Sequence, residues 1–172
     1  SIYSSFLFPH SETNSTRLER VTLIPLMNGV AYRTNKSKSY EICNPHFSIV
    51  HIWNNSSSFN SGEIVSTYTP TSTVYAVLME GETNFFNNSG TITAGYAVLL
   101  DNNTNAINTG TIAAEITAVK FDNSSSELVF FHNFGTIISA TGDAIEGDFG
   151  DETITNSGTI AGNITLKYGD DI

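Results

Sequence analysis

Four aspartates recur at similar places in the second half of the chain, each close to the end of a short apolar segment: Asp101, Asp122, Asp148 and Asp170. If these segments stack as parallel strands, carboxylates on neighbouring segments lie about 5 Å apart, and those two segments apart lie about 10 Å apart. Such separations are close to those of the acid and base pairs of glycosidases. The spacing follows from the strand lattice itself, however, and aspartate is a common turn residue. The sequence therefore favours turns over catalysis at these positions.

Two acidic blocks have the oxygen-rich composition that a hard cation such as calcium prefers: GDFGDET at 147–153 and YGDDI at 168–172. Neither block recurs at the short fixed period that is typical of calcium-binding glycine-rich repeats. We therefore predict that the protein has no metal site and no cofactor.

Residues for nucleophilic or acid–base catalysis are sparse. The four histidines, His10, His46, His51 and His132, are scattered, and beyond residue 50 the sequence has just two basic side chains, Lys120 and Lys167. No Gly-x-Ser-x-Gly, Walker or His-Glu-x-x-His motif occurs. We predict that the protein is not an enzyme and has no catalytic residues, with a polysaccharide-acting enzyme as the alternative.

The dominant feature of the sequence is an internal repeat, Asn-x-Gly-Thr/Glu-Ile, which occurs five times. Its members are Asn60–Ile64, Asn88–Ile92, Asn108–Ile112, Asn133–Ile137 and Asn156–Ile160. The motif glycines are 28, 20, 25 and 23 residues apart. Such intervals fit one coil of a β-helix with loops of variable length.

Each motif is followed by a second apolar block, so each coil holds at least two short strands. In the block that ends at Phe121, Lys120 must point outward, which turns Val119 and Phe121 inward by strand alternation. Stacking then places the five motif isoleucines in one inward column. The five motif asparagines are predicted to form a hydrogen-bonded ladder at a sharp bend, where the glycine permits close packing or a positive φ. We predict an all-β fold, a parallel β-helix (solenoid) of about five to six coils with an N-terminal cap region.

Three segments resemble the passenger domains of bacterial autotransporters, which are secreted by the type V route: NSGTITAGYAVLL at 88–100, TGDAIEGDFGDETITNSGTIAG at 141–162 and GNITLKYGDDI at 162–172. The resemblance covers roughly residues 55–172. It implies a β-helix carried to the cell surface by a C-terminal membrane barrel, and a role as an adhesin, toxin or host-cell effector. It also implies a secreted or cell-surface location, from a precursor anchored in the outer membrane. Because the chain ends within what looks like a continuing coil, we expect it to be a fragment of a longer protein.

The charge and the apolar content exclude several partner classes. A formal charge of −10 disfavours binding to a phosphate backbone or to an anionic membrane. No apolar run approaches the roughly 20 residues needed to span a bilayer. The single cysteine, Cys43, cannot form an internal disulfide. We predict a monomer with no nucleic-acid partner and no membrane insertion.

The charge is divided along the chain, which suggests two regions, 1–50 and 51–172. Residues 1–50 carry a net charge of +2, whereas the remainder carries −12. Solenoids need a cap over their exposed terminal coil, and residues 1–50 are predicted to form that cap together with the first coils. The alternative is that this region binds a partner itself, through its basic residues Arg17, Arg20, Arg33, Lys36 and Lys38.

Recognition is predicted to reside in departures from the repeat, where longer loops project from a rigid scaffold. The loop at 66–73 carries Tyr68, and a second loop spans 123–127. Tyr75 and Tyr96 align in successive coils and are predicted to form an aromatic patch on the outer face, the alternative being simple stacking between coils. The predicted partner is a protein or glycan on the host-cell surface. A structural stalk is the remaining alternative to binding and catalysis.

Overall fold

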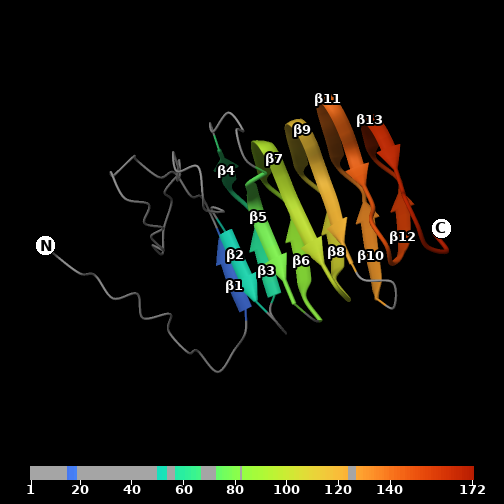
Figure 1. Cartoon of the computed structure of the whole chain (residues 1–172). Helices are drawn as coiled ribbons and strands as arrows, with labels where there is room; N and C mark the ends of the chain where they lie inside the picture. The colour runs from blue at the N-terminus through green and yellow to red at the C-terminus, as the bar shows by residue number, and fades with distance from the viewer. Residues whose placement is uncertain (1–14, 19–49, 54–56, 67–72, 82, 124–126) are drawn as a thin grey trace, which may run out of the picture.

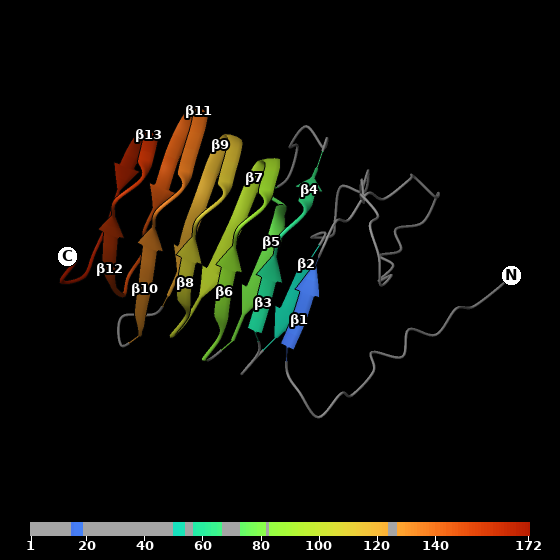
Figure 2. The same cartoon turned by 180° about the vertical axis from the view of Figure 1, so that it is seen from behind.

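Figure 1 shows a computed structural model, which describes residues 15–18, 50–53, 57–66, 73–81, 83–123 and 127–172. Every regular element in those ranges is a β-strand, and none of the described segments forms a helix that could cross a membrane. The strands form two parallel sheets whose members stack along one axis, as both views show (Figures 1 and 2).

The first sheet, sheet A, contains six short strands in the order β1 (Ser15–Leu18), β3 (Ser57–Asn60), β6 (Phe85–Asn88), β8 (Asn105–Asn108), β10 (Leu128–Asn133) and β12 (Asp151–Asn156). The second, sheet B, contains β2 (Val50–Trp53), β5 (Tyr75–Glu80), β7 (Thr91–Asp101), β9 (Thr111–Asp122), β11 (Thr136–Glu146) and β13 (Thr159–Thr165), in that order. A further short strand, β4 (Glu63–Val65), pairs with β7.

The chain passes from sheet A to sheet B through each Asn-x-Gly bend and returns to sheet A through a second turn. Equivalent residues of successive coils are paired in parallel register, for example Asn88 with Asn108 and Ile92 with Ile112. The prediction of an all-β parallel solenoid is therefore confirmed. The stack has about four turns rather than five to six, because five bends enclose four coils.

The core consists of columns of apolar side chains between the two sheets. Ile64, Ile92, Ile112 and Ile137 stand above one another and are almost completely buried, which confirms the predicted isoleucine column. Phe121 is buried beside it while Lys120 points outward, as alternation requires. Burial of this apolar surface is the main source of stability in a fold that has no helix in its described part.

The motif asparagines form the predicted ladder. The side-chain amide of each one donates to the side-chain oxygen of the next, at 2.7 Å for Asn60 to Asn88 and 2.8 Å for the following pairs, Asn88 to Asn108, Asn108 to Asn133 and Asn133 to Asn156. The four asparagines from Asn60 to Asn133 are buried. Each ladder contact therefore satisfies a polar group that water cannot reach.

We expect Asn108→Ala to lower the free energy of unfolding by about 1–3 kcal/mol, since it removes the short acceptor contact of the buried Asn88 amide and the donor to the buried side-chain oxygen of Asn133. The matched control is Asn105→Ala, at an exposed position of the same strand. It should change the free energy of unfolding by less than about 0.5 kcal/mol. Denaturant unfolding measures both. Equal effects of the two substitutions would contradict a stabilising ladder.

One described strand, β1, comes from the region predicted to be a cap, and β2 begins at its last residue, Val50. β1 pairs with β3 at the N-terminal edge of sheet A, and β2 pairs with β5 at that edge of sheet B. The rest of residues 1–50 lies outside the described part, so the cap stays a prediction.

Candidate functional site

The turns that lead from sheet B back to sheet A lie along one side of the solenoid, which we call the turn edge. Its described residues are 81, 83–84, 101–104, 122–123, 127, 147–150 and 166–172. Loop lengths differ from coil to coil here, whereas the Asn-x-Gly bends on the other side are uniform. The turn edge is therefore where one coil can differ chemically from the next.

Asp101 shows why aspartate suits these turns. Its Oδ1 accepts a hydrogen bond from the backbone N–H of Asn102 at 2.8 Å, and its Oδ2 accepts one from the N–H of Gly81 on the preceding coil at 3.1 Å. Asn103 then adopts a left-handed conformation with φ 50°, which asparagine tolerates better than most residues. The carboxylate of Asp101 is thus part of the turn.

The predicted column of four aspartates is a column of three. Asp101 is in register with Asp122, and Asp148 lies beside Asp122 on the next coil. Burial raises the pKa of the Asp122 carboxyl, Lys120 opposes that rise, and Asp148 adds to it. Two adjacent carboxyl groups of this kind are an arrangement that general acid–base chemistry uses.

Asp170 is not part of this column, which corrects the predicted alignment of the four aspartates at the ends of the apolar segments. Its backbone N–H donates to Oδ1 of Asp151 at 2.9 Å, so Asp170 stands above Asp151. The N–H of Tyr168 bonds to the carbonyl of Asp148 at 3.1 Å, which places Lys167 above Asp148. A lysine therefore follows the three aspartates.

Both lysines of the repeat region pair with one glutamate on the outer face of sheet B. Glu146 Oε1 lies 2.8 Å from Lys167 Nζ and 3.8 Å from Lys120 Nζ. The hydrogen bond to Glu146 raises the pKa of the Lys167 ammonium group. Among the residues that the structure describes, no group of three or more His, Cys, Asp or Glu side chains is arranged to hold a metal ion.

The most exposed feature of the turn edge is an aromatic pair. Phe149 and Tyr168 are 55 % and 62 % exposed, and their rings stack in parallel, with centroids 5.1 Å apart and planes 2° apart. Carboxylates flank the pair in the chain, in the order Asp148, Asp151, Asp170 and Asp171. This pair is not among the binding residues predicted from the sequence, although an alignment of DFGD at 148–151 with KYGD at 167–170 indicates it.

The predicted tyrosine patch differs from the expectation in one respect. Tyr75 and Tyr96 are paired in register, with ring centroids 5.4 Å apart, so stacking between coils is confirmed. Tyr75, however, is only 5 % exposed, and burial raises the pKa of its hydroxyl. The assignment to the outer face was wrong because Tyr75 shares its alternation phase with the buried Val77 and Met79.

The other predicted binding residues fall largely outside the described part of the chain. This applies to Tyr68, Arg20, Arg33, Lys36 and Lys38. Arg17 belongs to β1, in backbone register with Phe59, and its side chain is also outside the described part. Of the 123–127 loop, Asn123 is buried and its side-chain amide donates to the carbonyl of Glu127 at 3.4 Å.

Comparisons of this chain with protein-family models, with curated proteins and with solved structures give no match.

Proposed function

We propose that this chain is part of a surface-displayed passenger of the autotransporter class and that it acts as an adhesin-like binding module at or beyond the bacterial surface. The resemblance of residues 55–172 and the β-solenoid fold support the class. The observation that carries the binding role is the exposed Phe149–Tyr168 pair on a rigid stack of coils.

Such a pair is suited to recognition for a physical reason. Aromatic side chains provide a large contact area and have few rotatable bonds, so they lose little conformational entropy on binding. Here the rings already stack on each other, and their turns are hydrogen-bonded to each other through Asp151 and the N–H of Asp170. The surface is therefore largely organised before a partner arrives.

The charge around the pair indicates the chemistry of the partner. Four carboxylates lie within three residues of the two aromatic residues in the sequence: Asp148, Asp151, Asp170 and Asp171. Residues 51–172 together carry a net charge of −12. Complementary charge steers association and improves specificity. We propose a basic protein receptor on the host-cell surface, in which arginine or lysine side chains contact the two rings and the carboxylates.

The test is the double substitution Phe149→Ser and Tyr168→Ser in the purified protein. We expect attachment to host cells to weaken by roughly tenfold to hundredfold, because the main aromatic anchors are removed. Both side chains are exposed, so the thermal unfolding curve should change little. Attachment is measured as a binding isotherm, before and after protease treatment of the cells.

The matched control is Phe134→Ser, because Phe134 is as exposed as the pair but lies at an Asn-x-Gly bend, away from the turn edge. It should leave attachment unchanged. Attachment that survives protease but is lost after glycosidase treatment would identify a glycan as the partner. Attachment that is unaffected by the double substitution would refute the turn edge as the binding site.

A second candidate, an enzyme that acts on polysaccharide, is favoured by one observation. Asp122 and Asp148 lie side by side, and the pKa of Asp122 is raised, as a general acid requires. Asp122→Asn, which leaves the four carboxylates beside the aromatic pair unchanged, would then abolish hydrolysis of a polysaccharide substrate. If neither attachment nor hydrolysis depends on the turn edge, the third alternative, a structural stalk, describes the chain best.

A further inference from the structure

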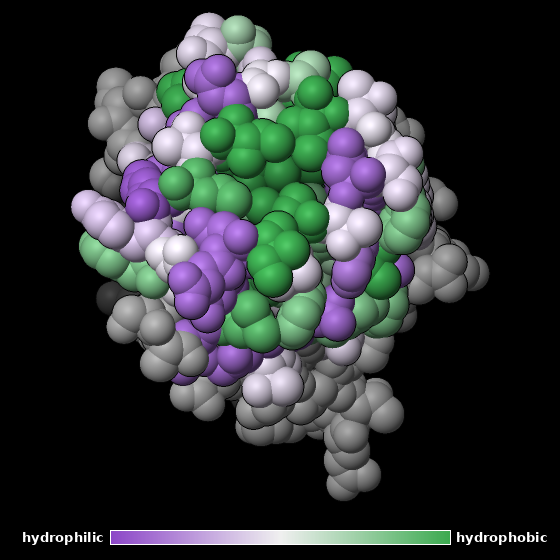
Figure 3. Space-filling view, turned by 90° about the vertical axis from the view of Figure 1, so that its right-hand side faces the viewer, coloured by the Kyte–Doolittle hydropathy of each residue, from purple (hydrophilic) through white to green (hydrophobic). Residues whose placement is uncertain are grey.

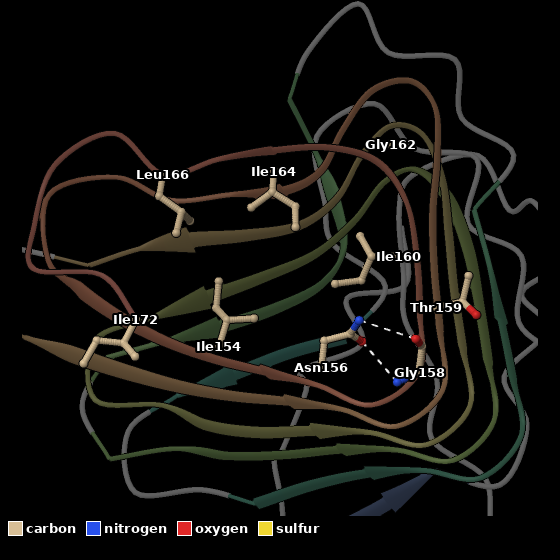
Figure 4. A pocket seen from close by; sticks show the side chains of 9 residues that line it. All are labelled: Ile154, Asn156, Gly158, Thr159, Ile160, Gly162, Ile164, Leu166 and Ile172. Carbon is tan, nitrogen blue, oxygen red and sulfur yellow. Dashed lines mark hydrogen bonds between the residues drawn. The ribbon is translucent and has the colours of Figure 1, made fainter.

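The C-terminal face of the solenoid is a hollow that is lined by the inward side chains of the last coil. Figure 3 shows the apolar surface gathered there, with hydrophilic residues around it. Figure 4 shows the side chains that line it, in particular Ile154, Ile160, Ile164, Leu166 and Ile172. Ile145 is completely buried, whereas Ile164, which stands above it on the last coil, is 52 % exposed. On the last coil, the apolar side chains are thus exposed at positions whose counterparts in the coils beneath are buried.

The asparagine ladder has a direction, and its donor end lies at this face. Each earlier ladder amide donates to the next asparagine at 2.7–2.8 Å and to the next threonine carbonyl at 3.3–3.5 Å. The amide of Asn156 keeps one donor contact among the described residues, to the carbonyl of Gly158 at 3.4 Å (Figure 4). The face therefore offers an amide donor beside an apolar hollow, together with the open edges of β12 and β13.

A second copy of this chain does not match that chemistry. Pairing of two C-terminal faces would set the amide donor of one Asn156 against that of the other. In head-to-tail stacking, the face would meet β1 at the opposite end of sheet A, where Leu18 stands in register with Asn60. Leucine has no side-chain acceptor, so the ladder would stop at the junction.

The backbone hydrogen bonds of Ile172 to β12 define the register in which a further coil would pair with the last one. Its N–H donates to the carbonyl of Glu152 at 2.9 Å, and its carbonyl accepts from the N–H of Ile154 at 2.7 Å. Ile172 therefore lies beside Thr153, with the hydrogen-bond pattern of a residue in a parallel sheet. A residue placed directly after it would stand above Ile154, and the third such residue would stand above Asn156.

We propose that the C-terminal face is a docking surface for one further parallel coil that continues from Ile172 and carries an Asn-x-Gly-Thr-Ile motif. Its asparagine oxygen accepts the free amide hydrogen of Asn156, its glycine allows the close approach seen at every bend, and its isoleucine covers Ile160. The contact continues the coil-to-coil interface already present in the molecule, and it does not depend on the proposed binding function.

The test is to append a second copy of residues 154–172 directly after Ile172, which preserves the register derived above. We expect the melting temperature to rise by about 4 °C or more. Amide hydrogen exchange at Ile160 and Ile164 should slow by at least about tenfold, since the edge of sheet B becomes paired.

Two appended controls make the experiment specific. One copy carries Asn156→Leu within the appended segment, and the other has the same composition in scrambled order. The leucine copy should give a smaller rise in melting temperature, and the scrambled copy none. The proposal is overturned if the faithful copy leaves melting and exchange unchanged, or if the scrambled copy acts equally well through unspecific apolar cover.

Discussion

Gly110→Ala is expected to destabilise the solenoid by about 3 kcal/mol or more. An added Cβ at Gly110 would lie 2.0 Å from the carbonyl oxygen of Gly90 and 2.7 Å from the carbonyl carbon of Ser89, both of them backbone atoms of the preceding coil. Backbone atoms cannot rotate away as a side chain can. The two coils must therefore separate at this bend.

That separation also breaks the hydrogen bonds that join the coils here. The N–H of Gly110 donates to the carbonyl of Asn88 at 3.0 Å, and the N–H of Thr111 donates to that of Gly90 at 2.8 Å. Denaturant unfolding measures the loss, and Thr109→Ala, an exposed neighbour, is the control that should change stability by less than about 1 kcal/mol. A Gly110→Ala protein as stable as this control would show that the coils are not in such close contact.

The second large effect is expected from a buried carboxyl group at the C-terminal end of the core. Glu152 is completely buried and stands above Val129. The side chain of Glu152 has room because the residue that stands above Phe121 on the next coil is a glycine, Gly147. A Cβ at Gly147 would lie 2.7 Å from Oε2 of Glu152. Burial, with the nearby charge of Asp171, raises the pKa of Glu152 from 4.5 to about 8.

The direction of the pH effect follows from this shift. Between pH 4.5 and pH 8 the unfolded chain has released the proton of Glu152, whereas the folded chain still holds it. The stability contributed by this group is fully present below pH 4.5 and is lost progressively up to pH 8. Glu152→Gln, which stays neutral, should therefore stabilise the protein by about 2–3 kcal/mol near pH 7 and by much less near pH 4.

Unfolding free energies measured at several pH values decide this prediction. Glu115→Gln is the matched control, because Glu115 is exposed and its replacement should not produce the same pH-dependent difference. If the difference in unfolding free energy between the Glu152→Gln protein and the unchanged protein is the same at about pH 4 and at about pH 7, the pKa of Glu152 is not raised in the fold.

The sequence by itself determined the architecture. One motif recurs at one phase of every coil, so stacking must set like residues above one another, and both the asparagine ladder and the isoleucine column follow from that alone. Alternation around Lys120 likewise predicted which side chains of its strand face the core. These features depend on local pattern and on the strand spacing, which are the same in every coil.

Only the tertiary structure decided the chemistry of the turn edge and of the C-terminal face. Five residues separate Asp122 from Leu128, whereas only two separate Asp148 from Asp151, the residue that pairs with Leu128, so the position of a carboxylate depends on loop length and not on the motif. The last turn has the same spacing as the turn before it, which sets Asp170 above Asp151 and stacks Tyr168 on Phe149. The burial of Glu152 likewise requires the missing side chain at Gly147, which lies in the turn after β11. Register between coils is a property of the whole stack, and no single repeat contains it.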